Sequence, residues 1–173
     1  PTVICSTLTT DGSRMALDAL AAGAVAVVAK PRLGLKQFLE ESRRELLQTL
    51  KTAARSRPRR VVAPAPVAAP SARLPMAGLH ALSVNKPIVL GASTGGTQAI
   101  ESVLTALPGD SPGIALVLHM PEKFTAMYAQ RLDGLCAMNV REARDGDRLE
   151  RGLVLIAPGG RHLQLRKASG QYF

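Results

Sequence analysis

One apolar run, followed at once by a glycine-rich turn and then by a helical pattern, restricts the fold of this chain more than any other feature. The run is Ile88–Leu90, the turn Gly91–Gly96 reads Gly-Ala-Ser-Thr-Gly-Gly, and apolar residues then recur at helical spacing up to Leu107. A strand that turns sharply into a helix lifts the intervening side chain onto the carboxyl edge of a sheet. The pattern predicts an α/β domain with Ser93 at a sheet edge.

A histidine follows the next apolar run of the chain. His119 comes directly after Ile114–Leu118. Successive strands of a parallel sheet end side by side, so Ser93 and His119 are expected to meet although they are distant in sequence. An imidazole beside a serine hydroxyl can accept its proton and activate it as a nucleophile. The pair therefore indicates serine-based hydrolysis.

Two other interpretations of the same residues stay open. A glycine-rich turn between a strand and a helix also binds phosphate through its backbone N–H groups, although the patterns G-x-G-x-x-G and G-x-x-x-x-G-K-[ST] are absent here. The pattern G-x-S-x-G is short, and a lone histidine is more often structural than catalytic. An anion-binding α/β domain is thus an alternative to a hydrolase.

Three parts are visible along the chain. Residues 1–51 read strand, helix, strand, helix, which is too little to bury a parallel sheet on both faces and suggests the end of a larger α/β domain. Residues 52–86 hold an arginine cluster and repeated Pro-Ala pairs, which favour an extended linker. Residues 87–173 resume the α/β alternation, with further strands expected near 114–118, 137–142 and 153–157 and a hairpin over 162–172.

Charge and composition exclude several classes of protein. The net charge is +9, but four arginines of the linker supply much of it, and stacking aromatics and DNA-binding motifs are missing, so nucleic-acid binding is not expected. No apolar stretch reaches the ~18 residues of a membrane span and no signal peptide is visible, so we expect a cytoplasmic protein. The two cysteines lack metal-ligand spacing, and no metal site is expected within the chain.

The motifs in this order resemble a known family. The tail of a receiver domain, a Pro/Ala linker, Gly91–Gly96, Val117–Pro121 (Val-Leu-His-Met-Pro) and Leu155–Gly159 (Leu-Ile-Ala-Pro-Gly) are similar to the chemotaxis response-regulator protein-glutamate methylesterases, the CheB family. The resemblance implies the C-terminal part of a flavodoxin-like receiver, a linker, and the N-terminal part of a doubly wound parallel α/β methylesterase domain. Such enzymes hydrolyse glutamyl methyl esters on chemoreceptors, and many members also deamidate receptor glutamines.

The resemblance also implies roles for single residues. Ser93 corresponds to the nucleophile, His119 to the general base, and Thr94 to an active-site neighbour. Ser6 and Lys30 correspond to the receiver residues that contact the phosphoryl group, a site that uses Mg²⁺ in the family. The implied partners are methyl-accepting chemoreceptors and a chemotaxis histidine kinase as phosphodonor, with regulation by receiver phosphorylation and no cofactor for the esterase reaction.

The chain departs from the family pattern at both ends. The phosphoacceptor aspartate and the acidic Mg²⁺ pair would precede Pro1, and the third catalytic residue, an aspartate, would follow Phe173. Asp145 and Asp147 lie in a turn that does not match the family's aspartate motif. We therefore expect little methylesterase activity from this chain alone. A non-catalytic module that docks on a receptor or kinase is the alternative from another class.

Overall fold

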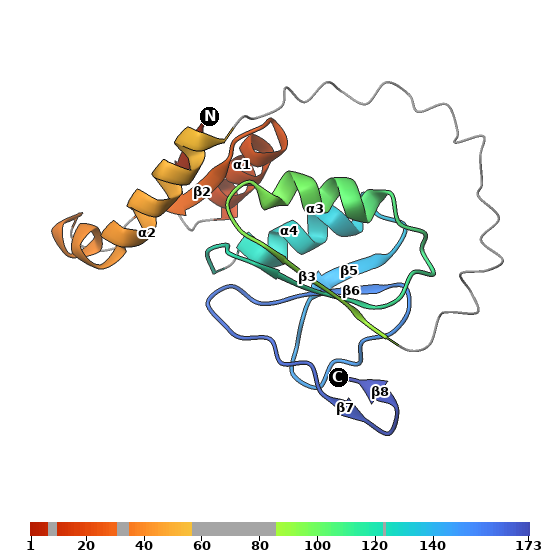
Figure 1. The fold of residues 1–173 in the computed structure, drawn as a ribbon. Coiled ribbons are helices and arrows are strands. Elements are labelled where there is room, and N and C mark those ends of the chain that lie inside the picture. Colours follow the sequence, from red (N-terminus) through yellow and green to blue (C-terminus); the bar gives the residue numbers. More distant parts are fainter. Residues whose placement is uncertain (7–9, 31–34, 57–85, 123) are drawn as a thin grey trace, which may run out of the picture.

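The N-terminal part forms a small parallel sheet with two helices. In the computed structural model, which describes residues 1–6, 10–30, 35–56, 86–122 and 124–173, this part is drawn from red to yellow in Figure 1. Its elements are β1 (Val3–Ser6), α1 (Thr10–Ala21), β2 (Ala26–Ala29) and α2 (Leu35–Arg55). β1 and β2 are parallel. The predicted order of strand, helix, strand and helix is confirmed, and α2 continues past residue 51 to Arg55. Most of the predicted linker, 57–85, lies outside the described residues.

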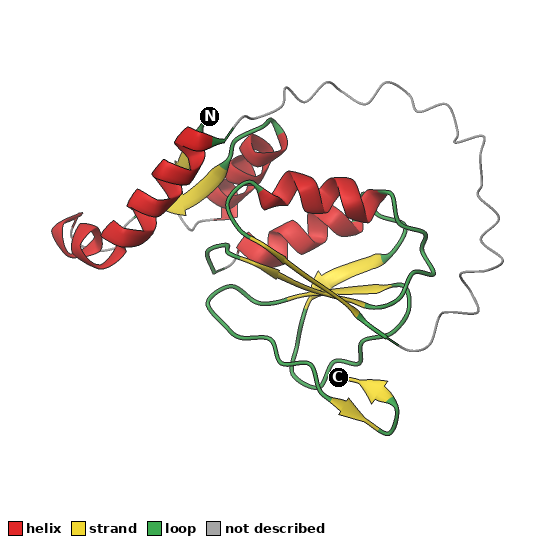
Figure 2. Ribbon diagram, in the orientation of Figure 1, coloured by secondary structure: helices red, strands yellow, loops and turns green. Residues whose placement is uncertain are grey.

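The C-terminal part is built on a four-stranded parallel sheet. Its elements in chain order are β3 (Ile88–Ala92), α3 (Gly96–Thr105), β4 (Ile114–Leu118), α4 (Phe124–Asp133), β5 (Asn139–Glu142) and β6 (Leu153–Ile156). The strand order is β3-β4-β6-β5, and every neighbouring pair is parallel. The strands are drawn in yellow in Figure 2. β6, the last strand of this sheet in sequence, thus lies between β4 and β5. The predicted parallel α/β fold of this part is confirmed.

The main core lies between this sheet and its helices. α3 and α4 lie on the same side of the sheet (Figure 1). There the fully buried strand residues Ile114, Leu116, Val154 and Ile156 meet the helices' buried side chains, among them Ile100, Leu104, Phe124 and Leu132. A smaller cluster covers part of the other face, where Ala115 and Leu155 pack with Leu149 and Ala143. A doubly wound sheet carries helices on both faces; within the described residues, α3 and α4 cover one face.

The N-terminal part shares this core. The α1 residues Ala16, Leu17 and Leu20 are buried in the same cluster as Ile100 and Leu104 of α3. Their spacing places them on one face of α1, as expected for an amphipathic helix. Burial of this apolar stripe therefore holds the first part of the chain against α3 and α4.

A buried tyrosine joins the two helices. Tyr128 of α4 is 2% exposed, and its hydroxyl donates a hydrogen bond to the carbonyl oxygen of Thr97 in α3 at 2.8 Å. Burial is the largest cause that raises the pKa of Tyr128 far above its ordinary value, so the phenol remains protonated as a donor. The bond fixes the first turn of α3 against α4.

A short hairpin ends the chain. It consists of β7 (Lys167–Ala168) and β8 (Gln171–Tyr172), which pair antiparallel, and agrees with the hairpin expected over 162–172. Among the helices that the structure describes, none has the length and apolar character needed to cross a bilayer.

Candidate active site

The pairing of β3 with β4 brings the predicted site residues to the same sheet edge. Ala92 and Leu118 are register partners at the ends of these strands. Ser93 and His119 are the residues that follow them. The backbone N–H of His119 donates to the carbonyl oxygen of Ala92 at 3.1 Å, which continues the strand pairing by one step. Ser93 and His119 therefore lie at the ends of two adjacent strands.

The turn after β3 depends on glycine. Gly95 has a φ of +79° and precedes the first residue of α3, and the N–H of Gly96 donates to the carbonyl of Ser93 at 2.8 Å. A Cβ on Gly96 would lie 2.5 Å from the Cβ of Ala92. This close approach lets the chain reverse from strand to helix and leaves Ser93 exposed, with Thr94 half-buried beside it.

Ser93, Thr94 and His119 line a single cavity of about 340 Å³. The N-terminal part also contributes to the walls, through β2, Leu20 of α1 and Leu46 of α2. One carboxylate is among the described lining residues, that of Glu122, three positions after His119. The sequence analysis missed Glu122 because an exposed glutamate in a loop carries no signal of its own.

Backbone and side-chain hydrogen bonds fasten the N-terminal part to this turn. The N–H of Gly95 donates to the carbonyl oxygen of Val25 at 2.9 Å. The side-chain Nε2 of Gln98, in the first turn of α3, donates to the carbonyl oxygen of Leu20 at 2.9 Å. The N–H groups at a helix start point outward and attract negative oxygen atoms. A carbonyl of the N-terminal part thus occupies a donor two residues after Ser93.

Ser6 and Lys30 also meet at a sheet edge. Ser6 ends β1 and is buried, and Lys30 follows β2 and is exposed. The N–H of Lys30 donates to the carbonyl oxygen of Ser6 at 2.6 Å. Mg²⁺ does not fit these two residues by themselves, and the described parts of the chain contain no group of three His, Cys, Asp or Glu side chains that could hold a metal ion.

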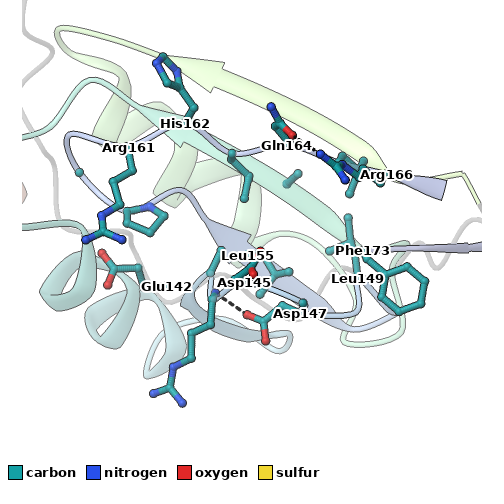
Figure 3. A pocket seen from close by; sticks show the side chains of 18 of the residues that line it. Glu142, Asp145, Asp147, Leu149, Leu155, Arg161, His162, Gln164, Arg166 and Phe173 are labelled. Carbon is teal, nitrogen blue, oxygen red and sulfur yellow. Dashed lines mark hydrogen bonds between the residues drawn. The ribbon is translucent and has the colours of Figure 1, made fainter. Parts of the chain in front are cut away.

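The two aspartates of the 145–147 turn lie elsewhere. Asp145 and Asp147 line a second, larger cavity of about 1150 Å³ on the other face of the sheet (Figure 3). Asp147 pairs with Arg141 and accepts a hydrogen bond from the N–H of Arg144 at 2.7 Å. The hydrogen bond from Arg141 is the largest cause that holds the pKa of Asp147 below its ordinary value. Neither aspartate is among the residues that line the cavity of Ser93 and His119.

Comparison with known proteins gives a consistent assignment. The family model described as CheB methylesterase matches residues 88–172. A protein-glutamate methylesterase/protein-glutamine glutaminase of Xanthomonas oryzae pv. oryzae is 54% identical over 183 aligned residues, which cover 100% of this chain and 52% of the relative. A protein of the same name from Anaeromyxobacter dehalogenans is 52% identical and is covered over 49% of its length. The chain thus spans about half the length of these relatives.

A solved structure agrees in fold. The catalytic domain of the Thermotoga maritima CheB methylesterase is similar with a TM-score of 0.50 and 41% sequence identity. The match covers 51% of this chain and 48% of that domain.

Proposed function

The chain belongs to the CheB methylesterase family through residues 88–172, and we propose that it is part of an enzyme that hydrolyses glutamyl methyl esters on methyl-accepting chemoreceptors. Relatives that are 54% and 52% identical are named protein-glutamate methylesterase/protein-glutamine glutaminase, which supports glutamine deamidation as a second reaction of the same site. For the whole protein we propose a cytoplasmic location, chemoreceptors as substrates and a chemotaxis histidine kinase as partner.

In the proposed reaction Ser93 is the nucleophile and His119 is the general base. The imidazole takes the hydroxyl proton as the serine oxygen bonds to the ester carbonyl carbon, and it returns that proton to the departing methanol. Water then cleaves the acyl-serine by the same steps and frees the glutamate. Backbone N–H groups at the start of α3 stabilise the oxyanion, and Thr94 borders the reacting atoms. With glutamine as substrate, ammonia leaves in place of methanol.

The N-terminal part is proposed to be the end of a receiver domain that covers this site. Its residues line one side of the cavity of Ser93 and His119, and the carbonyl oxygen of Val25 accepts a hydrogen bond from the N–H of Gly95. Phosphorylation of the receiver by a chemotaxis histidine kinase then releases the cover. Ser6 and Lys30, which meet at the end of β1 and β2, are the proposed contacts of the phosphoryl group.

One observation carries the catalytic proposal: the β3–β4 register starts Ser93 and His119 from adjacent strand ends and lets both line one cavity. The test is methanol release from methyl-labelled receptor by the full-length protein and its Ser93→Ala variant. Ser102→Ala is the matched control, because Ser102 is an exposed serine of α3 whose hydroxyl contacts only the Gln98 carbonyl of its own helix.

The expected outcome is loss of turnover in Ser93→Ala, with an unchanged circular dichroism spectrum and full activity in the control. Wild-type turnover in Ser93→Ala would remove the nucleophile from the proposal. No turnover by the wild-type protein, together with retained binding to the receptor, would favour the non-catalytic docking module instead.

A further inference from the structure

A buried threonine hydroxyl joins two loops at the carboxyl edge of the sheet. Thr125, the second residue of α4, has 0% exposure. Its hydroxyl donates to the Oε1 atom of Glu142, at the end of β5, at 2.5 Å. The same oxygen accepts the backbone N–H of Gly159, in the loop after β6, at 2.9 Å. A hydroxyl can donate and accept at once, so both partners are satisfied by one atom.

Gly159 in turn lies directly on the loop that carries His119. A Cβ on Gly159 would lie 2.8 Å from the Cα of Glu122 and 2.9 Å from the carbonyl oxygen of Pro121. Side-chain carbon atoms are not found this close to backbone atoms, so the two backbones touch because residue 159 is glycine. The position of Gly159 therefore sets the position of Pro121 and Glu122.

The contact reaches His119 through a short, restrained segment. Met120 is buried in the main core, and the carbonyl oxygen of Pro121 accepts the N–H of Phe124 at 3.1 Å. On the other side of Gly159, Gly160 lines the same cavity as Ser93 and His119. The loop of His119 is thus held between the end of β4, the start of α4 and Gly159.

We propose that Thr125 is a positioning residue for the Ser93–His119 site, because its hydroxyl holds Gly159 against the loop that carries His119. The Glu142 carboxylate accepts the hydrogen bond from the Thr125 hydroxyl, which orients the oxygen lone pairs toward the N–H of Gly159. The catalytic consequence rests on the proposed function, whereas the position of the loop does not.

Thr125→Val tests the proposal in the full-length protein, because valine keeps the shape and removes the hydroxyl. We expect kcat for ester hydrolysis to fall about 10- to 100-fold, as for a misplaced catalytic group, with KM changed by less than about twofold. Thr125→Ser restores the hydroxyl and should return kcat to within about threefold of wild type. Thr105→Val is the control, because the exposed Thr105 hydroxyl contacts only carbonyls of its own helix.

A second readout follows the loop without catalysis. In amide NMR spectra, Thr125→Val should shift the signals of residues 119–122 and Gly160, and the Gly159 N–H should exchange faster with solvent. If Thr125→Val does not fold, Glu142→Ala replaces it and should give the same shifts with a smaller loss of kcat.

The outcomes separate the two proposals. A folded Thr125→Val protein with wild-type kcat, or with unchanged signals for residues 119–122, overturns the positioning role. Shifted signals together with wild-type turnover in Ser93→Ala would overturn the proposed nucleophile, while the loop would still be held by Thr125.

Discussion

The carbonyl oxygen of Val25 and the backbone N–H of Gly95 form a hydrogen bond of 2.9 Å between two segments that lie far apart in sequence. Gly95 is two residues after Ser93 and directly before α3. In the proposed reaction, N–H groups at this helix start stabilise a negative oxygen. If the N-terminal part covers the site as proposed, the Val25 carbonyl would compete with the substrate oxygen for an N–H group at this helix start.

Weakening the cover should raise the basal activity of the full-length, unphosphorylated protein. Gln98→Ala removes the hydrogen bond to the Leu20 carbonyl. A lost hydrogen bond of about 0.5–1.5 kcal/mol increases the uncovered population by roughly 2- to 10-fold. The measurement is methanol release before phosphorylation, with Gln130→Ala, an exposed glutamine of α4, as control. Equal activity in Gln98→Ala and wild type would show that this contact does not hold the cover.

Substitutions of Ser93 and His119 should have non-additive effects on kcat. Each single variant, Ser93→Ala or His119→Gln, should reduce kcat by about 10³-fold or more, and the double variant should be no worse than either one, because paired catalytic groups are not additive. Single-turnover hydrolysis of methyl-labelled receptor measures all three. If the losses multiply in the double variant, the two residues act in separate steps.

The turn after β3 should tolerate no side chain at residue 96. Gly96→Ala places a Cβ 2.5 Å from that of Ala92 and should lower the free energy of unfolding by about 1–3 kcal/mol. Gly134→Ala is the control, since its Cβ would lie 3.6 Å from the carbonyl oxygen of Arg131, an ordinary contact. Urea unfolding measures both. Adding Ala92→Gly to Gly96→Ala should recover part of the loss, and no recovery would place the strain elsewhere.

The ion pair of Arg141 and Asp147 should stabilise the fold only above acidic pH. The pKa of Asp147 is lower in the folded chain than its ordinary value of 3.8, so its stabilisation is present above that value and is lost as the pH falls through the folded pKa. Asp147→Asn should cost less than about 1 kcal/mol at pH 7 because the pair is near the surface. In thermal unfolding from pH 7 to 2, the stability difference between wild type and Asp147→Asn should shrink as the pH falls. The control variant Asp145→Asn, at an exposed position, should show no such trend.

The sequence predicted the geometry of the candidate site through local rules. Ser93 follows a strand and begins a glycine turn, and His119 follows the next strand, so the carboxyl edge of a parallel sheet was enough to bring both together. Strands were also expected near residues 137–142 and 153–157, where β5 and β6 lie. The roles of Ser93 as nucleophile and of His119 as base stay predictions.

Long-range contacts were beyond the same reasoning. The sequence pattern does not reveal that β6 lies between β4 and β5, because several strand orders bury the same apolar residues. This order places Gly159 next to the loop of His119, so the contacts of Thr125 could not be anticipated from a threonine at a helix start. The bonds of Val25 and Gln98 depend in the same way on how two parts of the chain dock.

The buried Tyr128 is an intrinsic spectroscopic probe near the candidate site. The chain has no Trp and two Tyr residues, and Tyr172 lies in the terminal hairpin, far along the chain from α4. The Tyr128 hydroxyl is bonded to Thr97, which lines the cavity of Ser93. Tyrosine fluorescence of this chain therefore comes from two places, one of them beside the turn that carries Ser93. A tryptophan introduced into the N-terminal part would be the sole tryptophan of this chain, so tryptophan emission would report on that part alone.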